Sequence, residues 1–321
     1  MLTMRFVLSL LLLCPFAAQA AELPGIPMFI DEMVTKHQFE RAELANVFAR
    51  AQHNPAVIEL ISRPATIKPW LEYRAIFVNP KRVKLGLEFW NKYPNTLRRA
   101  EQKYGVPQEI IVAIIGVETI YGQNAGNFLV LDALATLAFD YPRRADFFRS
   151  ELENYLLLAR EQQFDLLDIR GSYAGALGIP QFMPSSYRNY AVDFNSNRTI
   201  DLLRENVDSI GSVANYLQGY GWIKGEPVAT RAQIGAELPA SAAGTPRTLA
   251  EWAATGIVPG VNFASDKPAR LIDFTVEEGK EYWLAFNNFE VITRYNNSDF
   301  YAMSVFQLAE ELKAARKAGK P

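Results

Sequence analysis

Apolar residues recur every three or four positions over most of this chain, which is the spacing of one buried face of an α-helix. Between residues 26 and 100, prolines divide this pattern into several short helices. Between residues 106 and 222 the spacing predicts longer helices, over 129–139, 148–158 and 207–220. A final amphipathic helix is predicted over residues 303–316. The chain is therefore expected to be mainly α-helical.

The pattern changes after Gly225, where short apolar and β-branched runs alternate with Gly, Pro and Ser. These runs predict strands near residues 228–230, 271–274, 282–286 and 289–293. The expected fold class is mainly α (α+β). Its units are an N-terminal α-domain (21–100), a second helical unit (101–225), a small inserted β-domain (226–286) and a C-terminal segment with a closing helix (287–321).

One glutamate, Glu118, interrupts an otherwise apolar helix that reads IIVAIIGVETI over residues 110–120. A carboxylate among Ile, Val and Ala is poorly solvated, so its pKa should be raised. A carboxyl group that stays protonated near neutral pH can donate a proton in catalysis. The structural alternative is a glutamate at the helix end that reaches water or caps a neighbour, because perturbed carboxylates also occur in structural networks.

Composition excludes several kinds of chemistry. The chain has 321 residues, which favours two or three compact units, and a net charge of −2, which argues against nucleic-acid binding. It contains one cysteine, Cys14, and two histidines, His37 and His53, both in the N-terminal helical region. Disulfides, Cys-based zinc sites and a Ser-His-Asp triad are therefore disfavoured. Catalysis has to use carboxylates, hydroxyls, amides and aromatic side chains.

The first 20 residues have the features of a secretory signal peptide. Arg5 precedes an apolar run over residues 6–13, and Ala18-Gln19-Ala20 forms a small-x-small cleavage signal. The apolar run is too short to cross a bilayer as a helix. The mature protein is therefore expected in the periplasm, in soluble form. The alternative is an outer-membrane lipoprotein acylated at Cys14, although Leu13 stands where such a signal normally has a small residue.

Two further segments carry groups that could serve Glu118. Residues 171–184 read GSYAGALGIPQFMP, in which small residues allow close backbone approach and Ser172 and Gln181 supply a hydroxyl and an amide. Asn215 and Tyr216 lie on the helix predicted over 207–220. Aromatic rings with polar edges suit a sugar, whose faces are apolar and whose rims are polar. The structural alternative for the glycine-rich run is a tight helix–loop connection.

Several long motifs resemble the B-type lytic transglycosylases, which cleave bacterial peptidoglycan. They are GVETIYG, FDYPRRADFFRSEL, SYAGALGIPQFMPSSY, VDSIGSVANYL and FNNFEVITRYNNSDFYAMSV, and the resemblance extends from about residue 26 to 316. It implies that residues 101–225 form a lysozyme-like catalytic core and that the C-terminal segment (287–321) returns to the α-domain.

The same resemblance implies a role for individual residues. Glu118 is the catalytic acid, and Ser172 supports it by a hydrogen bond. The sugar-binding positions are Tyr73, Gln181, Tyr216 and Tyr295. Arg143 and Arg144 form a basic pair that could meet stem-peptide carboxylates, with solvated helix-end arginines as the structural alternative.

The implied reaction is non-hydrolytic cleavage of the β-1,4 bond between N-acetylmuramic acid and N-acetylglucosamine, leaving 1,6-anhydro ends during cell-wall turnover. One carboxyl group can protonate the leaving oxygen and then deprotonate the muramoyl 6-hydroxyl, whereas two-carboxylate schemes need a second group. The sequence alone does not exclude a second catalytic acid, such as Asp132 or Asp140. A hydrolytic muramidase and a non-catalytic peptidoglycan-binding scaffold are the alternatives.

The expected partner is the peptidoglycan glycan strand. Proteins of cell-wall synthesis or cell division are further candidates, and the chain is expected to act as a monomer without a catalytic cofactor.

A second candidate site is a loop with oxygen-bearing side chains at alternate positions. Asp193, Asn195 and Asn197, with the Thr199 carbonyl, are spaced as in the first half of an EF-hand calcium loop. Arg198 stands where the turn prefers glycine, and by family resemblance the last ligand falls on Asp208. The sequence therefore predicts a structural Ca²⁺ site, of weakened affinity because two amides replace carboxylates. The alternative is an Asn/Asp-rich turn without metal.

Overall fold

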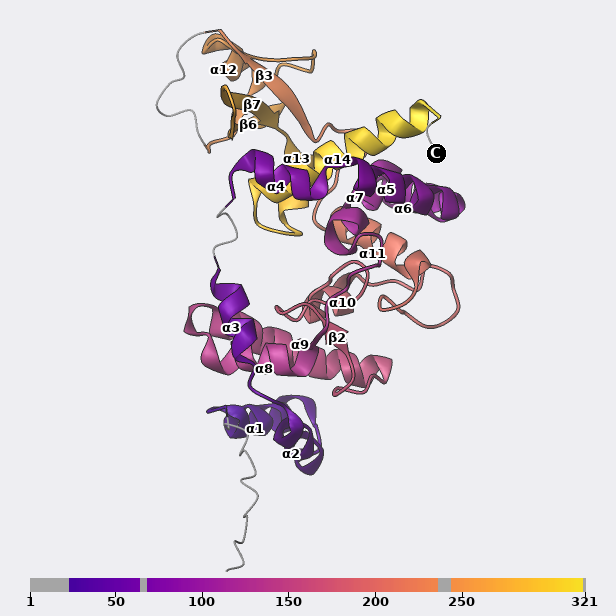
Figure 1. Ribbon diagram of the computed structural model, residues 1–321, viewed down its shortest axis with the longest axis vertical. Helices are drawn as coiled ribbons and strands as arrows, with labels where there is room; N and C mark the ends of the chain where they lie inside the picture. The colour runs from indigo at the N-terminus through magenta and orange to yellow at the C-terminus, as the bar shows by residue number, and fades with distance from the viewer. Residues whose placement is uncertain (1–22, 64–67, 236–243, 320–321) are drawn as a thin grey trace, which may run out of the picture.

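The computed structural model describes residues 23–63, 68–235 and 244–319 and is mainly helical. The predicted signal peptide and Cys14 lie outside these residues. The chain forms an elongated molecule in which the β-sheet lies at one end and helices α1 and α2 at the other (Figure 1). Within the described part of the chain, no helix has both the length and the apolar character that a membrane span requires.

The N-terminal helices separate into two groups. Helices α1 (Ile26–His37), α2 (Arg41–Arg50) and α3 (Pro55–Ser62) lie toward α8 and α9, and α3 packs on α8. Helices α4 (Trp70–Phe77), α5 (Pro80–Lys92) and α6 (Pro94–Tyr104) instead lie beside the C-terminal helix or α11 (Figure 1). Both groups join one hydrophobic core.

Prolines begin several of these helices. Pro55, Pro80 and Pro94 each occupy the first turn, where a missing N–H breaks no hydrogen bond within the helix. Asn54 and Asn79 cap α3 and α5 by accepting hydrogen bonds from backbone N–H groups of the first turn. Prolines that divide the helical pattern in the sequence therefore mark helix starts.

Helix α7 (Gln108–Thr119) lies at the centre of the molecule. Residues 110–117 are all buried, and helices α5, α6, α11 (Asn206–Gly219) and α14 (Asp299–Lys317) surround it. A helix that is apolar on every face must be enclosed on every face. This enclosure fixes the position of Glu118 near its C-terminal end.

Helices α8 (Val130–Asp140) and α9 (Ala145–Gln162) pack against each other, joined by a short 3₁₀ helix (Pro142–Arg144). Two short strands, β1 (Phe128–Leu129) and β2 (Arg170–Gly171), pair with each other. Strand β2 ends at the first residue of the glycine-rich segment (171–184), which leads into α10 (Pro184–Tyr190). This helical region between residues 108 and 219 carries most of the site described below.

A five-stranded antiparallel sheet has the strand order β4-β6-β7-β3-β5. Its strands are β3 (Ala229–Ile234), β4 (Arg247–Thr248), β5 (Ile257–Pro259), β6 (Pro268–Val276) and β7 (Gly279–Ala285), and α12 (Leu249–Ala254) accompanies them. Trp252 and six other side chains form a separate small core in this unit. Three of the four predicted strands are therefore confirmed.

The fourth predicted strand, residues 289–293, is wrong, since these residues belong to helix α13 (Asn287–Thr293). The run is short and contains Val and Ile, so its composition favours a strand. In the structure Phe289 and Ile292, three residues apart, are fully buried, as a helix packed on one side requires. Tertiary packing therefore overrides local preference.

Helix α14 then returns to α4, α5 and α7. The helices and the small sheet together confirm the expected mainly α (α+β) class.

Candidate active site

Glu118 is the last charged residue of α7 and borders a cavity of about 690 Å³. Residues 110–117 and Thr119 of its helix are buried, whereas the Glu118 side chain is partly exposed to the cavity. Burial raises the pKa of Glu118 to about 7, from an ordinary value of 4.5. The predicted direction of this shift is confirmed. Near neutral pH the group can therefore both donate and accept a proton.

Tyr301 holds this carboxyl group. Its hydroxyl donates a hydrogen bond of 2.5 Å to Oε1 of Glu118, and this bond lowers the pKa of Glu118 against the larger effect of burial. Tyr301 lies in the first turn of α14, where Ser298 caps the helix by accepting from the Tyr301 backbone N–H. One oxygen of Glu118 is thus engaged by Tyr301, while Oε2 accepts no hydrogen bond from the residues that the structure describes.

The chain turns sharply after Glu118. Ile120 and Tyr121 adopt left-handed backbone angles, with φ of 53° and 60°, which is unfavourable for a β-branched residue such as Ile120. Thr119 stabilises the turn, because its hydroxyl donates to the Ile179 carbonyl and accepts from the Gly122 N–H. These bonds connect the end of α7 to the glycine-rich segment, so Glu118 and that segment are positioned together.

The glycines of residues 171–184 allow close packing within the protein. A Cβ at Gly171 would lie 2.2 Å from the Ala176 carbonyl oxygen, and one at Gly178 would lie 2.2 Å from that of Leu202. These two glycines therefore support the tight-connection alternative. Ser172 and Gln181 do line the cavity. The Ser172 hydroxyl accepts from the N–H groups of Ala174 and Ala176, and no hydrogen bond between Ser172 and Glu118 is recorded, so the supporting role of Ser172 stays a prediction.

Gln181 also has a left-handed backbone conformation, with φ of 52°. Its amide nitrogen donates to the carbonyl oxygens of Ala125 and Gly178, which fixes the side chain beside the cavity. The amide oxygen has no recorded donor within the described protein. Gln181 therefore presents an acceptor of fixed position.

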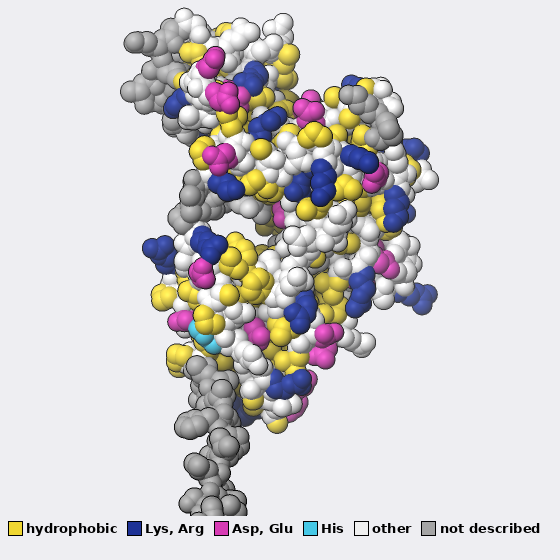
Figure 2. All heavy atoms as spheres, in the orientation of Figure 1, with side chains coloured by type: hydrophobic (Ala, Val, Ile, Leu, Met, Phe, Trp, Pro, Cys, Tyr) yellow, Lys and Arg dark blue, Asp and Glu magenta, His cyan; other side chains and the backbone are white. Residues whose placement is uncertain are grey.

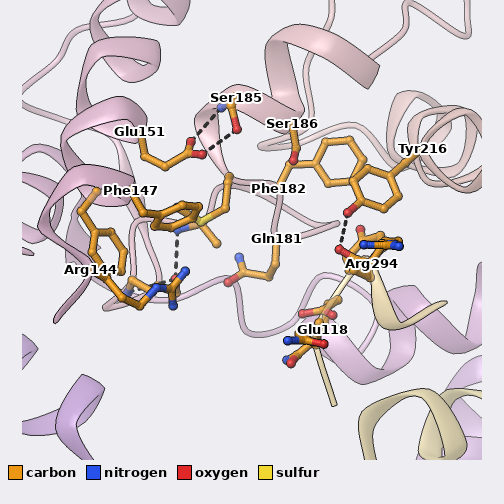
Figure 3. A pocket seen from close by; sticks show the side chains of 18 of the residues that line it. Glu118, Arg144, Phe147, Glu151, Gln181, Phe182, Ser185, Ser186, Tyr216 and Arg294 are labelled. Carbon is orange, nitrogen blue, oxygen red and sulfur yellow. Dashed lines mark hydrogen bonds between the residues drawn. The ribbon is translucent and has the colours of Figure 1, made fainter. Parts of the chain in front are cut away.

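The cavity opens in the hollow between the part of the molecule that carries α4 and α14 and the part that carries α8 and α9 (Figure 2). Around Glu118 it is lined mainly by aromatic and polar side chains (Figure 3), among them Arg144, Phe147, Phe148, Glu151, Ser172, Tyr173, Gln181, Phe182, Met183, Ser185, Tyr216, Tyr220, Arg294, Tyr295, Asn296 and Asn297.

Two of the three predicted tyrosines line this cavity. The Tyr216 hydroxyl donates to the Arg294 carbonyl at 2.6 Å, and the Tyr295 hydroxyl donates to the Pro180 carbonyl at 2.6 Å. Their hydroxyl groups therefore tie distant segments of the chain together, and their rings form the wall. Tyr73 is not among the lining residues, but it lies close enough to Glu118 for that carboxylate to contribute, after burial, to a pKa of Tyr73 of about 12.

The α9 side of the cavity combines a basic and an acidic residue. The guanidinium of Arg144 lies over the rings of Phe147 and Phe148, at 4.3 and 5.1 Å from their centroids. Glu151 accepts hydrogen bonds from both the N–H and the hydroxyl of Ser185 at the start of α10. Arg143 is exposed and is not a lining residue.

Neither Asp132 nor Asp140 lines the cavity. Asp132 is buried and accepts from the Gln52 N–H, and Asp140 bonds to the ring of His53. His37 likewise bonds to Glu153. Asp132 and Asp140, which the sequence offered as additional catalytic acids, therefore lie in contacts between the N-terminal helices and α8.

Side chains of the candidate calcium loop accept hydrogen bonds from its own backbone. Asp193 accepts from the N–H groups of Asn197 and Arg198, and Asn197 accepts from that of Thr199. Asp208 is fully buried beneath the loop, where its two oxygens accept from the N–H groups of Phe194 and Asp201. Within the described residues, no group of three or more His, Cys, Asp or Glu side chains suits a metal ion. The candidate donors at this loop are two carboxylates, two side-chain amides and one backbone carbonyl.

The sequence reasoning missed three residues at these sites. Tyr301 lies 183 positions from Glu118, and no local pattern relates the two. Glu151 could have been found, because it occupies the apolar face of the helix predicted over 148–158, as Glu118 does on its own helix. Glu205 lies inside the candidate calcium loop and accepts from the amide nitrogens of Asn195 and Asn197. It adds a carboxylate to a loop in which Asn replaces two.

Known proteins match this chain over most of its length. The model of the transglycosylase SLT domain matches residues 24–310. The membrane-bound lytic murein transglycosylase B of Escherichia coli is 45% identical over 306 residues, which cover 92% of this chain and 84% of that protein.

Two solved structures of similar proteins were obtained with ligands. The E. coli lytic transglycosylase Slt35 in complex with calcium has a TM-score of 0.86 and 46% identity, covering 92% of this chain and 95% of that one. SltB3 of Pseudomonas aeruginosa in complex with NAG-anhNAM-pentapeptide has a TM-score of 0.81 and 31% identity, covering 89% of this chain and 78% of that one. The long family match, together with the acid on its buried helix, shows that the chain belongs to the lytic murein transglycosylase family.

Proposed function

We propose that this protein cleaves the β-1,4 bond between N-acetylmuramic acid and N-acetylglucosamine in peptidoglycan without water, leaving 1,6-anhydromuramic ends. The observation that carries the proposal is Glu118, a carboxyl group with a pKa of about 7 at the edge of an aromatic and polar cavity. Complexes of the similar SltB3 with peptidoglycan fragments support the substrate, and one of those fragments is an anhydro sugar.

In the proposed reaction Glu118 acts first as acid and then as base. Its proton passes to the leaving glycosidic oxygen as the anomeric carbon gains positive charge. The carboxylate then removes the proton of the muramoyl 6-hydroxyl, whose oxygen attacks that carbon and closes the anhydro ring. Since Tyr301 engages Oε1, Oε2 is the oxygen that exchanges the proton with the substrate. A pKa near 7 serves both steps.

The cavity has no second carboxylate that is free to activate water among its described lining residues. Glu151 is the other acidic residue among the lining residues, and it is 4% exposed, with both oxygens bonded to Ser185. A water-activating base needs a free oxygen facing the bond that is cleaved. In the view of Figure 3, Glu151 and Glu118 lie on different sides of the pocket. The arrangement therefore favours the transglycosylase over the hydrolytic muramidase.

The residues around Glu118 are proposed to bind the glycan. Tyr216, Tyr295 and Gln181 form the wall nearest the acid, with Tyr73 and Ser172 beside it. Arg144, and Arg143 next to it on the surface, would attract the carboxylates of stem peptides. The mixture of aromatic rings and hydrogen-bonding groups suits the apolar faces and polar rims of sugars.

Two variants of the lining carboxylates test the proposal. Glu118→Gln keeps the shape of the side chain and should reduce the release of muropeptides from purified sacculi by roughly 10²–10⁴-fold. Glu151→Gln, the matched control, should retain activity if its fold is intact. Mass spectrometry of the products decides the reaction type, because anhydro products are lighter than hydrolysis products by one water. Near-normal turnover by a folded Glu118→Gln protein would refute the assignment, and hydrated products would establish the muramidase.

We also propose a structural Ca²⁺ site in the loop of Asp193, Asn195, Asn197, the Thr199 carbonyl and Asp208. The calcium complex of the similar Slt35 supports it, as does the donor set, because carboxylate, amide and carbonyl oxygens are the ligands that Ca²⁺ prefers. Glu205 would compensate for the two asparagines by adding negative charge at the loop. Calcium bound here would stabilise the fold and would take no part in the proton transfer.

The proposed location is the periplasm, after removal of residues 1–20. The similar protein of E. coli is named as membrane-bound. Acylation of Cys14 would attach this chain to the outer membrane and is the alternative.

A further inference from the structure

Exposed aromatic rings are concentrated at one place in the described structure. The large aromatic side chains that are most exposed are Phe147, Tyr173 and Tyr220, at 39%, 38% and 40%, and all three line the cavity around Glu118. An exposed aromatic ring contributes little to folding, so its position beside a polar cavity suggests contact with a ligand.

Tyr220 differs from the other two because it ends a continuous row of tyrosine rings. The row starts at Tyr301, which bonds to Glu118, and continues through Tyr295, Tyr216 and Tyr220. Successive ring centroids lie 6.4, 4.8 and 4.6 Å apart. Tyr301 and Tyr216 are buried, whereas Tyr220 reaches the surface. The row therefore leads along the cavity wall, away from the catalytic acid and toward solvent.

The ring of Tyr220 is held in position from two sides. Tyr216 packs against it, and the ring of Tyr190 lies 5.2 Å from it, centroid to centroid. A hydrogen bond between the Tyr190 and Tyr220 side chains raises the pKa of Tyr190. A ring fixed in this way loses little conformational freedom when a ligand binds to it. By contrast, Arg144 already lies over the ring of Phe147.

Polar groups line the same cavity as Tyr220. Arg294, Asn296 and Asn297 are exposed lining residues from the connection between α13 and α14, and Figure 3 shows Arg294 next to Tyr216. A flat ring with guanidinium and amide groups nearby matches a pyranose, which has an apolar face and a rim of hydroxyl and N-acetyl groups.

We propose that Tyr220, supported by Tyr190, is an additional glycan-binding position that stacks on a sugar of the strand beyond the one that Glu118 contacts. This inference rests on the proposed function, because it assumes a glycan in the cavity. It predicts that Tyr220 contributes to the binding of long glycans and not of the shortest ones, and that it takes no part in the proton transfer.

Binding of peptide-free chitooligosaccharides of increasing length tests this proposal. Calorimetric titrations are made in a Glu118→Gln background, which prevents turnover, with Tyr220→Ala, Tyr220→Leu and Tyr220→Phe. The matched control is Ile223→Ala, an apolar residue three positions away that is 48% exposed, against 40% for Tyr220, and does not line the cavity. The Leu variant fills most of the volume if the Ala variant proves unstable.

Tyr220→Ala and Tyr220→Leu should bind long oligomers roughly 3- to 10-fold more weakly, bind the shortest ones normally and melt near the parent temperature. Tyr220→Phe and Ile223→Ala should bind like the parent. In the active enzyme, Tyr220→Leu should raise KM for glycan strands and leave kcat unchanged.

Equal affinity of the Tyr220→Leu and parent proteins for every length would overturn the inference. A loss confined to peptide-bearing fragments would also overturn it, because the ring would then contact the stem peptide. If the parent protein binds no glycan and releases no muropeptide, the proposed function itself fails, which is a distinguishable outcome.

Discussion

Replacing Glu118 by Gln should stabilise the protein in a pH-dependent way, in addition to abolishing its activity. The pKa of Glu118 is about 7 in the folded protein and 4.5 as an ordinary value. The folded state therefore holds the proton more tightly than the unfolded state does. The stability that this provides is complete below pH 4.5 and is lost as the pH rises through 7. A Gln side chain has no proton to lose.

The magnitude follows from the size of the shift. Each pKa unit corresponds to about 1.4 kcal/mol, so the shift of Glu118 corresponds to at most about 3 kcal/mol. Because the carboxyl group is partly exposed to the cavity, solvent reduces this value, and about 1–3 kcal/mol is expected. For a chain of this size about 2 °C in Tm corresponds to each kcal/mol. The Tm advantage of Glu118→Gln should therefore grow by about 2–6 °C between pH 5 and pH 8.

Thermal unfolding of both proteins across this pH range measures the difference directly. The Gln side chain can still accept the hydrogen bond of Tyr301, so the comparison isolates the charge. Glu88→Gln, at an exposed position of the neighbouring helix α5, provides the control and should show no such trend. A difference in Tm between Glu118→Gln and the native protein that is independent of pH would refute the reasoning, since it would mean that Glu118 is well solvated.

Three other predictions concern the surroundings of Glu118 and the calcium loop. Tyr301→Phe removes a hydrogen bond that lowers the pKa of Glu118, so the decline of kcat above pH 7 should move to higher pH, and an unchanged pH–rate profile would contradict the role of Tyr301. Tyr216→Phe and Tyr295→Phe each leave a backbone carbonyl without its donor, so thermal melts should show a loss of about 1 kcal/mol, while glycan affinity, measured by calorimetry, persists with the ring. Millimolar Ca²⁺ should raise the Tm of the native protein by mass action, and chelator should reverse this. Asp193→Asn should abolish the rise and Glu205→Gln should weaken the affinity, whereas identical melts with calcium and chelator would indicate a turn without metal.

The central part of the site could be predicted because its cause is local. A single glutamate among ten uncharged and almost wholly apolar residues favours both a buried helix and a raised pKa, and both are present at Glu118. The strands at β3, β6 and β7 could be predicted for the same reason, since alternation and turn residues act over a few positions. Gln181 and Tyr216 could be singled out from their segments, and resemblance to a family added Tyr295. No local pattern places the three residues in one cavity.

Contacts between distant segments could not be predicted. The bond from Tyr301 to Glu118 requires α14 to return beside α7 after the whole β-sheet, and nothing near either residue indicates this. The composition of residues 289–293 predicts a strand, whereas the structure has helix α13 (Asn287–Thr293) there, because packing stabilises the helix and composition does not report packing. The long-range arrangement therefore determines how the acid is held, whereas the local sequence determines only that an acid is present.

The β-sheet helps to position Tyr301, although none of the sheet residues lines the cavity. Arg270 on β6 bonds to both oxygens of Asp299 at 2.6 and 2.9 Å, and to Glu290 on α13 at 2.8 Å. Asp299 begins α14, two residues before Tyr301. A paired, bidentate guanidinium fixes both distance and orientation. The sheet therefore anchors the start of the helix whose tyrosine holds Glu118, and this links a distant part of the chain to the pKa of Glu118.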